Sequence, residues 1–216
     1  MCGRYSLIRP LDEVAMRFLI DMRAFGSLPP RPNIAPTEPL LAVRLSPEHE
    51  RQAAWLRWGL SPSWVGLADP RPINARAETA AERPMFRSAL RLRRALLPAD
   101  AFYEWRRAGR TRQAIRFSLR DGGLFALAAL WERRATPEGP LETACILTTQ
   151  PNALVAEVHD RMPVILRPEE EDAWLDPDSP AARIAQLLVP YPAEGMAAQE
   201  VPPTRGPGPL AVPPPA

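Results

Sequence analysis

The sequence predicts an α+β fold, in which a single compact domain is built mainly on an antiparallel, barrel-like β-sheet with several short helices. The first reason is length, because 216 residues fit one domain. The second is composition, since a hydrophobic fraction of 46% is ordinary for a globular protein. The third is pattern: short runs with strand character are separated by proline and glycine, and no segment is repeated.

The N-terminal part of the chain contains strand and helix patterns in alternation. Residues 4–8 alternate as a strand does, and residues 11–22 place apolar side chains at helical spacing. The proline-rich stretch 28–39 predicts an extended loop. Short apolar runs at 40–45 and 53–58 predict the next two strands.

The remainder of the chain continues as short elements. Strands are predicted at 95–97, 102–105, 114–119, 124–130 and 143–148. Helices are predicted at 75–82, 85–90, 153–158, 168–175 and 181–188. The Asp-Gly-Gly sequence at 121–123 predicts a hairpin turn between two of the strands. The domain is expected to span residues 1–192, followed by a proline-rich, disordered tail at 193–216.

Basic charge is concentrated in the middle of the chain. All 27 basic residues are arginine, and 25 acidic residues leave a formal net charge of +2. Between Arg83 and Arg120 the arginines are opposed only by Asp100 and Glu104. Guanidinium groups bind phosphate bidentately, so this segment suits a phosphate-lined partner. The alternative interpretation is that these arginines only lie on solvent-exposed faces and bind no partner.

Composition argues against several classes of protein. The two cysteines, Cys2 and Cys145, are too few for a disulfide framework, and Cys145 is expected to be a buried small hydrophobe in a strand. His49 and His159 match no zinc-ligand spacing, so no metal site is expected. There is no signal peptide or membrane-spanning run, which predicts a cytoplasmic protein; a monomer is the default.

The N-terminus carries the most reactive groups. Methionine aminopeptidase removes Met1 when a side chain as small as that of Cys2 follows it, which leaves a 1,2-aminothiol. Such an amine and thiol have ordinary pKa values of about 7.7–8.0 and about 8.5. The chain has no lysine, so this α-amine is its one aliphatic amine. An aldehyde is its favoured partner, because the amine forms an imine that the adjacent thiol closes into a thiazolidine ring.

Seven motifs follow one another in an order that resembles the SRAP family, the SOS-response-associated peptidase-like proteins. The resemblance extends from Met1 to about Tyr191. The motifs are MCGRY at 1–5, NIAPT at 33–37, WGLSPSW at 58–64, INARAE at 73–78, LLPADAFYEW at 96–105, ILTT at 146–149 and VHDRMPVIL at 158–166.

The resemblance implies an enzyme-like function on damaged DNA. In that family the terminal cysteine attacks the ring-opened aldehyde of an abasic site in single-stranded DNA. The product is a stable thiazolidine crosslink that shields the site. Removal of Met1 is required, and autoproteolysis, crosslink reversal and weak lyase activity are further expectations. The implied partner is single-stranded DNA that contains abasic sites, and no cofactor is needed.

The resemblance also implies catalytic roles beside Cys2 for three residues. Asn74 would orient the opened sugar through its amide, although an asparagine is also a common turn or cap residue. Glu104 lies between aromatic residues, where burial would raise its pKa and suit it to shuttle a proton; an outward-facing strand residue is the alternative. His159 would relay protons near neutral pH, although a lone histidine is often structural.

The expected DNA contacts fall into two groups. Polar side chains near the reactive residues would bind the backbone, and aromatic or apolar side chains would stack on bases or wedge beside them. The same apolar side chains would also fit a hydrophobic core. The first group consists of Arg4, Asn33, Arg76 and Arg161, and the second of Trp64, Met85 and Phe86.

Two other functions remain open from the residues alone. Class II glutamine amidotransferases also begin Met-Cys-Gly and use the cysteine thiolate against an amide, although their Asn-Gly pair for the oxyanion hole is missing from this sequence. A non-covalent binder of single-stranded or modified DNA would use the arginines without Cys2 chemistry. A requirement for Cys2 separates the covalent function from the second alternative.

Overall fold

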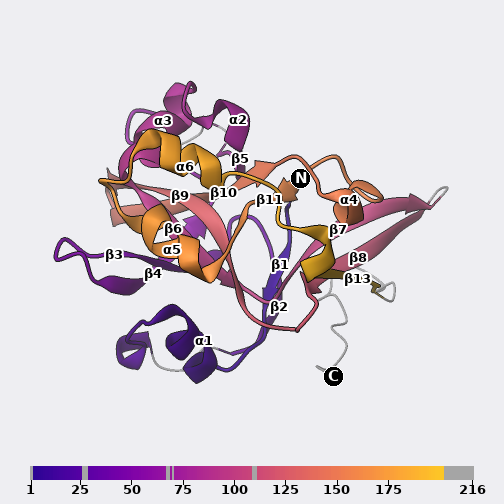
Figure 1. Ribbon diagram of the computed structural model, residues 1–216. Coiled ribbons are helices and arrows are strands. Elements are labelled where there is room, and N and C mark those ends of the chain that lie inside the picture. The colour runs from indigo at the N-terminus through magenta and orange to yellow at the C-terminus, as the bar shows by residue number, and fades with distance from the viewer. Residues whose placement is uncertain (1, 26–28, 67–68, 70, 109–110, 202–216) are drawn as a thin grey trace.

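The computed structural model describes residues 2–25, 29–66, 69, 71–108 and 111–201, and its strands form two sheets with helices on the outside (Figure 1). The smaller sheet has the order β13-β8-β7-β1-β2, and all its neighbouring strands are antiparallel. Its strands are β1 (Tyr5–Leu7), β2 (Arg31–Ile34), β7 (Ala101–Ala108), β8 (Thr111–Leu119) and β13 (Met196–Glu200).

The larger sheet closes into a barrel. The path β10-β4-β3-β6-β9 returns to its start because β9 also pairs with β10, and β5, β11 and β12 pair along this ring. The parallel pairs among the described strands are β10 with β4 and β10 with β5. The predicted α+β fold with a mainly antiparallel, barrel-like sheet is confirmed. The strands are β3 (Pro39–Leu45), β4 (Arg51–Trp58), β5 (Asn74–Arg76), β6 (Arg94–Ala99), β9 (Phe125–Thr136), β10 (Gly139–Thr149), β11 (Met162–Pro163) and β12 (Ile165–Leu166).

Short helices cover the sheets. In α3, Phe86, Ala89 and Leu90 are buried while Arg87 and Arg91 are exposed, which is the spacing of an amphipathic helix. The α-helices are α1 (Leu11–Phe18), α2 (Ala77–Ala80), α3 (Pro84–Leu92), α4 (Ala153–Ala156), α5 (Glu171–Leu175) and α6 (Ala181–Leu187). Three 3-10 turns are η1 (Arg23–Phe25), η2 (Pro168–Glu170) and η3 (Ala193–Gly195).

One hydrophobic core connects the two sheets. Tyr5 of β1 packs edge-on against Trp58 of β4, with 5.6 Å between ring centroids, and so joins the smaller sheet to the barrel. Phe102 and Phe117 stack on neighbouring strands of the smaller sheet at 5.1 Å. Cys145 lies in β10 and is fully buried in this core, as predicted. The N-terminal strand is therefore fixed on both its edges and its inner face.

The first helix is shorter than the predicted 11–22. It ends at Phe18 because Leu19 adopts a left-handed conformation, with φ of 54°. A left-handed residue at this position ends a helix, and the N–H of Ile20 then donates to the Ala15 carbonyl at 3.1 Å. A glycine is the usual signal for such a stop, and none is present here.

Two other predicted segments contain unexpected strands. The proline-rich loop predicted at 28–39 includes β2, which tolerates Pro32 because it lies at the edge of its sheet. The helix predicted at 75–82 is only α2, because Asn74–Arg76 form β5 instead and pair in parallel with β10. In both cases pairing with a distant strand overrides the local pattern.

The hairpin predicted at 121–123 is wrong. The turn itself forms, with Gly122 at φ of 70°, but β8 and β9 on its two sides belong to different sheets. β8 pairs with β7 and β13, whereas β9 pairs with β6, β10 and β12. The turn therefore carries the chain from the smaller sheet to the barrel.

The folded region extends beyond the expected limit at residue 192. η3 and β13 lie within the stretch 193–216 that was expected to be disordered, and β13 pairs with β8 from Met196 to Glu200. Val201 is buried against Tyr103 and Ala114, and its N–H donates to the Ala114 carbonyl at 2.9 Å. The remainder of the expected tail, 202–216, lies outside the described residues.

A buried carboxylate fastens β1 to the end of β6. Asp100 is 2% exposed and accepts hydrogen bonds from the Ser6 hydroxyl and the Ile8 N–H, both at 2.5 Å. The N–H of Asp100 donates in turn to the Ser6 carbonyl at 3.0 Å. Arg116 lies 3.8 Å from the carboxylate and supplies the opposite charge. These contacts fix the strand that begins just after Cys2.

Replacing Asp100 with alanine is expected to lower the free energy of unfolding by about 3 kcal/mol, because it leaves the Ser6 hydroxyl and the Ile8 N–H without their acceptor and Arg116 without its opposite charge. Urea denaturation measures this change. Asp12→Ala, on the exposed face of α1, is the matched control and is expected to change the value by less than about 0.5 kcal/mol. Equal losses in the two variants would contradict the anchoring role of Asp100.

Candidate active site

The pairing of β1 with β7 brings Glu104 to the N-terminus. Tyr5 pairs with Phe102, and the N–H of Tyr103 donates to the Arg4 carbonyl at 3.0 Å. Because the strands are antiparallel, the next residue along β7 lies beside the residues that precede Arg4. That residue is Glu104.

Strand alternation turns Glu104 inward. Tyr103 and Trp105 lie on the face of β7 that packs against Val201, whereas Phe102 lies in the main core. Successive side chains of a strand point to opposite faces, so Glu104 shares the inner face with Phe102. Glu104 is only 3% exposed. This burial raises the pKa of the Glu104 carboxyl, which is the expected direction, although the adjacent Tyr103 and Trp105 face the other way.

Cys2 is fully buried beside this carboxyl. Its thiol donates a weak hydrogen bond to the Arg4 carbonyl, with 3.9 Å between sulfur and oxygen. Burial, and secondly the negative charge of Glu104, raise the pKa of the Cys2 thiol. The chain that still carries Met1 therefore holds this sulfur as a neutral thiol, which is a poor nucleophile.

Asn74 contacts Cys2 from the barrel side. The pairing of β5 with β10 aligns Asn74 with Ile146, and its side-chain amide donates to the Cys2 carbonyl at 3.1 Å. The other amide atom, Oδ1, is buried and accepts no hydrogen bond from any described residue. Asn74 thus holds the Cys2 backbone and keeps one acceptor for a further group.

His159 lies at the solvent side of Glu104. Its Nε2 is 3.8 Å from a Glu104 carboxylate oxygen, and a quarter of its side chain is exposed. The segment that carries it follows α4, whose first turn is capped by Asn152 through a 2.9 Å hydrogen bond from the Val155 N–H. A buried acid and a partly exposed imidazole therefore connect Cys2 with solvent.

The other ring nitrogen of His159, Nδ1, has two polar neighbours. Nδ1 accepts a hydrogen bond from the Arg161 N–H at 3.0 Å, which requires its lone pair. Nδ1 also lies 2.9 Å from an Asp160 carboxylate oxygen. Both ring nitrogens therefore lie close to polar groups, Nε2 to Glu104 and Nδ1 to Asp160 and the Arg161 N–H, as a proton relay requires.

Comparison with known proteins identifies the family of this chain. The family model described as SOS response associated peptidase (SRAP) matches residues 1–205. The chain belongs to the SRAP family. The predicted resemblance is thus confirmed, and the match extends past residue 192 as the folded region does.

Individual relatives of this SRAP protein cover most of its length. Abasic site processing protein YoqW of Bacillus subtilis is 42% identical over 93% of this chain and 92% of its own. Abasic site processing protein YedK of Escherichia coli is 30% identical over 81% of this chain and 79% of its own. A crystal structure of a protein from Bacteroides thetaiotaomicron has a TM-score of 0.85 at 28% identity, covering 93% of this chain and 92% of that one.

Arg161 of this SRAP protein is held by protein groups. Its guanidinium makes two 2.7 Å hydrogen bonds to Glu78 at the start of α2 and a 2.6 Å hydrogen bond to the Thr148 carbonyl. The first of these interactions lowers the pKa of the Glu78 carboxyl. Arg161 was expected to contact phosphate, but in this structure it joins the His159 segment to α2 and β10.

Replacing Glu78 with glutamine is expected to lower the free energy of unfolding by about 0.5 kcal/mol at pH 7, a small value because 41% of the Glu78 side chain is exposed. A lowered pKa stabilises the fold above the ordinary value of about 4.3 and ceases to do so as the pH falls through the lowered value. The difference from the parent should therefore disappear in acid. Urea denaturation at pH 7 and pH 3 measures it, with exposed Glu82→Gln as the control.

The remaining expected DNA contacts differ in accessibility. Trp64 is 64% exposed and Arg76 is exposed, so both can meet a ligand. Arg4 is partly exposed and donates to the Gly3 carbonyl at 2.7 Å. Asn33 is half-buried, and its Oδ1 accepts no hydrogen bond from the described part of the chain.

Phe86 does not suit the stacking role expected for the Met85-Phe86 pair. It is 8% exposed and belongs to the main core, because α3 turns this side chain toward the barrel. Met85 is half-buried and packs against the same core. A base could therefore reach only the exposed part of Met85.

Within the described ranges, no three His, Cys, Asp or Glu side chains gather where they could hold a metal ion. None of the helices in the same part of the chain is long and apolar enough to cross a membrane.

Sequence reasoning missed the supporting residues Asp100 and Glu78. Asp100 lies in LLPADAFYEW and Glu78 in INARAE, so the motifs contained them without indicating their roles. A carboxylate inside an otherwise apolar strand motif was the available signal for Asp100. No local pattern indicates that Glu78 would meet Arg161, which lies 83 residues away.

Proposed function

We propose that this protein processes abasic sites in DNA through a covalent bond to Cys2. The observation that supports this function best is the convergence of Cys2, Asn74, Glu104 and His159 from four separate segments. Relatives that cover most of the chain are named abasic site processing proteins. An abasic deoxyribose opens to an aldehyde, which is the electrophile that an N-terminal aminothiol prefers.

The reaction begins after Met1 has been removed, by an aminopeptidase or by self-cleavage. The free α-amine of Cys2 attacks the C1′ aldehyde carbon, and the resulting carbinolamine loses water to give an imine. The Cys2 sulfur then adds to the imine carbon while its proton passes to the nitrogen. The products are a thiazolidine and one water molecule, and the ring closure is intramolecular and hence fast.

The neighbouring residues have separate roles in these steps. Glu104, with its raised pKa, protonates the departing hydroxyl of the carbinolamine and takes up protons in turn. His159 exchanges these protons with solvent. Asn74 holds the Cys2 carbonyl and offers its buried Oδ1 to a hydroxyl of the opened sugar. Strand cleavage at the imine and reversal of the crosslink are side reactions of the same intermediates.

The substrate we propose is single-stranded DNA. Exposed Trp64 offers a ring for base stacking. Arg4 follows Cys2 by two residues and Arg76 follows Asn74 by two, so both arginines can bind DNA phosphates beside the reactive residues. No cofactor takes part. The protein acts as a monomer in the cytoplasm, where reducing conditions keep Cys2 free.

The test is a denaturing gel. Purified protein, with Met1 removal verified by intact mass, is mixed with a single-stranded oligonucleotide that contains one abasic site. A heat-stable, slower band is expected. It should be missing when the aldehyde has been reduced to an alcohol, and when an uncleaved residue precedes Cys2. No band from correctly processed protein would overturn the proposal and favour amide hydrolysis or non-covalent DNA binding.

A further inference from the structure

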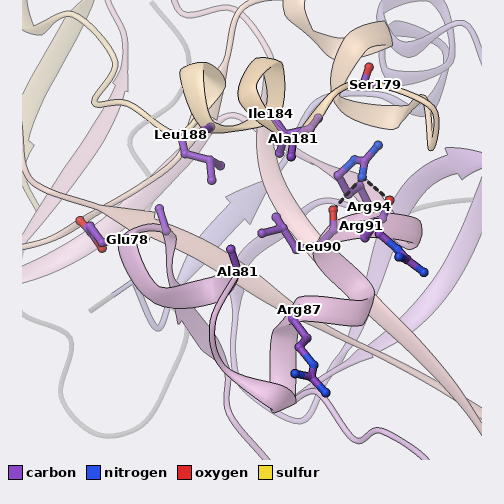
Figure 2. Close-up of a pocket in the computed structure, with 12 residues that line it drawn as sticks. Glu78, Ala81, Arg87, Leu90, Arg91, Arg94, Ser179, Ala181, Ile184 and Leu188 are labelled. Atoms are coloured by element: carbon purple, nitrogen blue, oxygen red, sulfur yellow. Dashed lines mark hydrogen bonds between the residues drawn. The ribbon is translucent and has the colours of Figure 1, made fainter.

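A groove lies between α3 and α6, beside α2 (Figure 2). It encloses about 560 Å³, which is within the range of ligand pockets. Ile184 and Leu188 point from the α6 segment toward Leu90 of α3, as Figure 2 shows, and small alanines of α2 and α6 complete the floor. The groove is therefore apolar at its base and open to solvent.

Arginines form one rim of this groove. Arg87 and Arg91 are exposed, and within the described part of the chain neither guanidinium has a hydrogen bond or ion pair. They lie four residues apart on α3, about 6 Å along its axis. The nearby Arg94 differs, because it is buried and donates to the carbonyls of Leu90, Arg91 and Trp174. Two cations at the rim thus remain available to a ligand.

The negative charge on the opposite wall of the groove is neutralised by an ion pair. Glu78 is the one acidic residue that lines the described groove, and its carboxylate is already paired with Arg161. The net charge presented to a ligand is positive. An anionic partner is therefore favoured by charge complementarity.

The lining distinguishes an acidic peptide from a nucleic acid strand. Bases bind by stacking on aromatic side chains, and the described lining of the groove contains none. An aliphatic cavity instead fits the anchor side chains of a peptide, as in helix-in-groove recognition. The planar forks of Arg87 and Arg91 match carboxylates bidentately.

We propose that the groove between α3 and α6 docks an acidic peptide segment of another protein, which inserts aliphatic side chains over Leu90 and Ile184 and pairs its carboxylates with Arg87 and Arg91. This interaction is separate from Cys2 chemistry. It gives the protein a means of recruitment that does not depend on the reaction proposed above.

The first test selects ligands for the full-length protein from a phage-displayed library of random peptides about twelve residues long. Enriched peptides are expected to be net acidic and to carry aliphatic side chains three or four positions apart. The most enriched peptide is then synthesised with a fluorescein label, and its affinity is measured by fluorescence polarisation. A failure to enrich peptides, or enrichment of basic or unbiased ones, would overturn the proposal.

Matched variants locate the binding. Ala185→Phe fills the groove from an exposed position of α6, and Ala182→Phe adds the same ring on an exposed position outside it. Arg91→Glu reverses a rim charge, and Arg183→Glu does so outside the groove. The groove variants are expected to weaken binding about tenfold or more, and the outside variants less than about twofold. Circular dichroism melting checks that all four remain folded.

Other occupants give different results. If Ala185→Phe weakens binding of oligothymidylate as much as that of the peptide, the groove belongs to the DNA footprint. If it dissociates a dimer in sedimentation, the groove holds a second copy. Either result, or equal effects of groove and outside variants, would overturn the peptide proposal. Crosslinking to abasic DNA should be unchanged in Ala185→Phe, so the two functions are tested independently.

Discussion

Replacing Cys2 with alanine is expected to abolish the heat-stable adduct with abasic single-stranded DNA. The variant still loses Met1 and still has an α-amine, so it can form the imine. It has no thiol to close the thiazolidine ring, and an imine hydrolyses during denaturing electrophoresis. The expected result is complete loss of the slower band on the gel, with a band recovered only when borohydride traps the imine.

The other cysteine provides the matched control. Cys145 is also fully buried, in β10, but it lies within the apolar core and has no place in the proposed chemistry. Cys145→Ala should leave the adduct intact, and both variants should lose only about 1 kcal/mol of stability. An adduct that survives in Cys2→Ala without borohydride, or disappears in Cys145→Ala while the protein is folded, would contradict the assignment.

Replacing Glu104 with glutamine is expected to slow adduct formation about 10²- to 10⁴-fold, the usual contribution of a positioned acid or base. Glutamine keeps the shape of the side chain and lacks the exchangeable carboxyl proton. Single-turnover kinetics on denaturing gels measure the rate. Exposed Glu157→Gln, at the end of α4, is the control and should react like the parent. An unchanged rate in Glu104→Gln would exclude the proton-transfer role.

The pH dependence tests the same role of Glu104. Its raised pKa means that the carboxyl keeps its proton to higher pH than usual, and the rate should fall as the pH rises through that raised value. The free energy of unfolding should also fall as the pH rises through that value, because the folded state binds the proton more tightly than the unfolded state does. Glu104→Gln should therefore lose both this fall in rate and this part of the fall in the free energy of unfolding as the pH rises.

Local patterns predicted most of the individual elements. The strands at 40–45, 95–97, 114–119 and 143–148 and the helix at 181–188 all lie within two residues of observed elements or inside them. Local patterns failed where a long-range contact decides the conformation. Asn74 to Arg76 form a strand only because β10 lies beside them, and β2 forms only against β1. The turn at Gly122 has the Asp-Gly-Gly sequence and positive φ typical of a hairpin turn, but it connects strands of two different sheets.

The candidate site shows the same division. By itself the sequence predicts the reactive group, because removal of Met1 before the small Cys2, in a chain without lysine, would leave a single aminothiol. It also determined the family, through several motifs in one order. These are properties of composition and covalent neighbours, which do not depend on how the chain folds.

Only the tertiary structure decided which side chains surround Cys2 and which are diverted to other roles. The register of β1 on β7 turns Glu104 inward, and the pairing of β5 with β10 brings Asn74 to the Cys2 carbonyl. Helix packing buries Phe86, and Glu78 occupies Arg161. Burial and pairing depend on residues tens of positions apart, whose contacts form only when the sheets close around a common core.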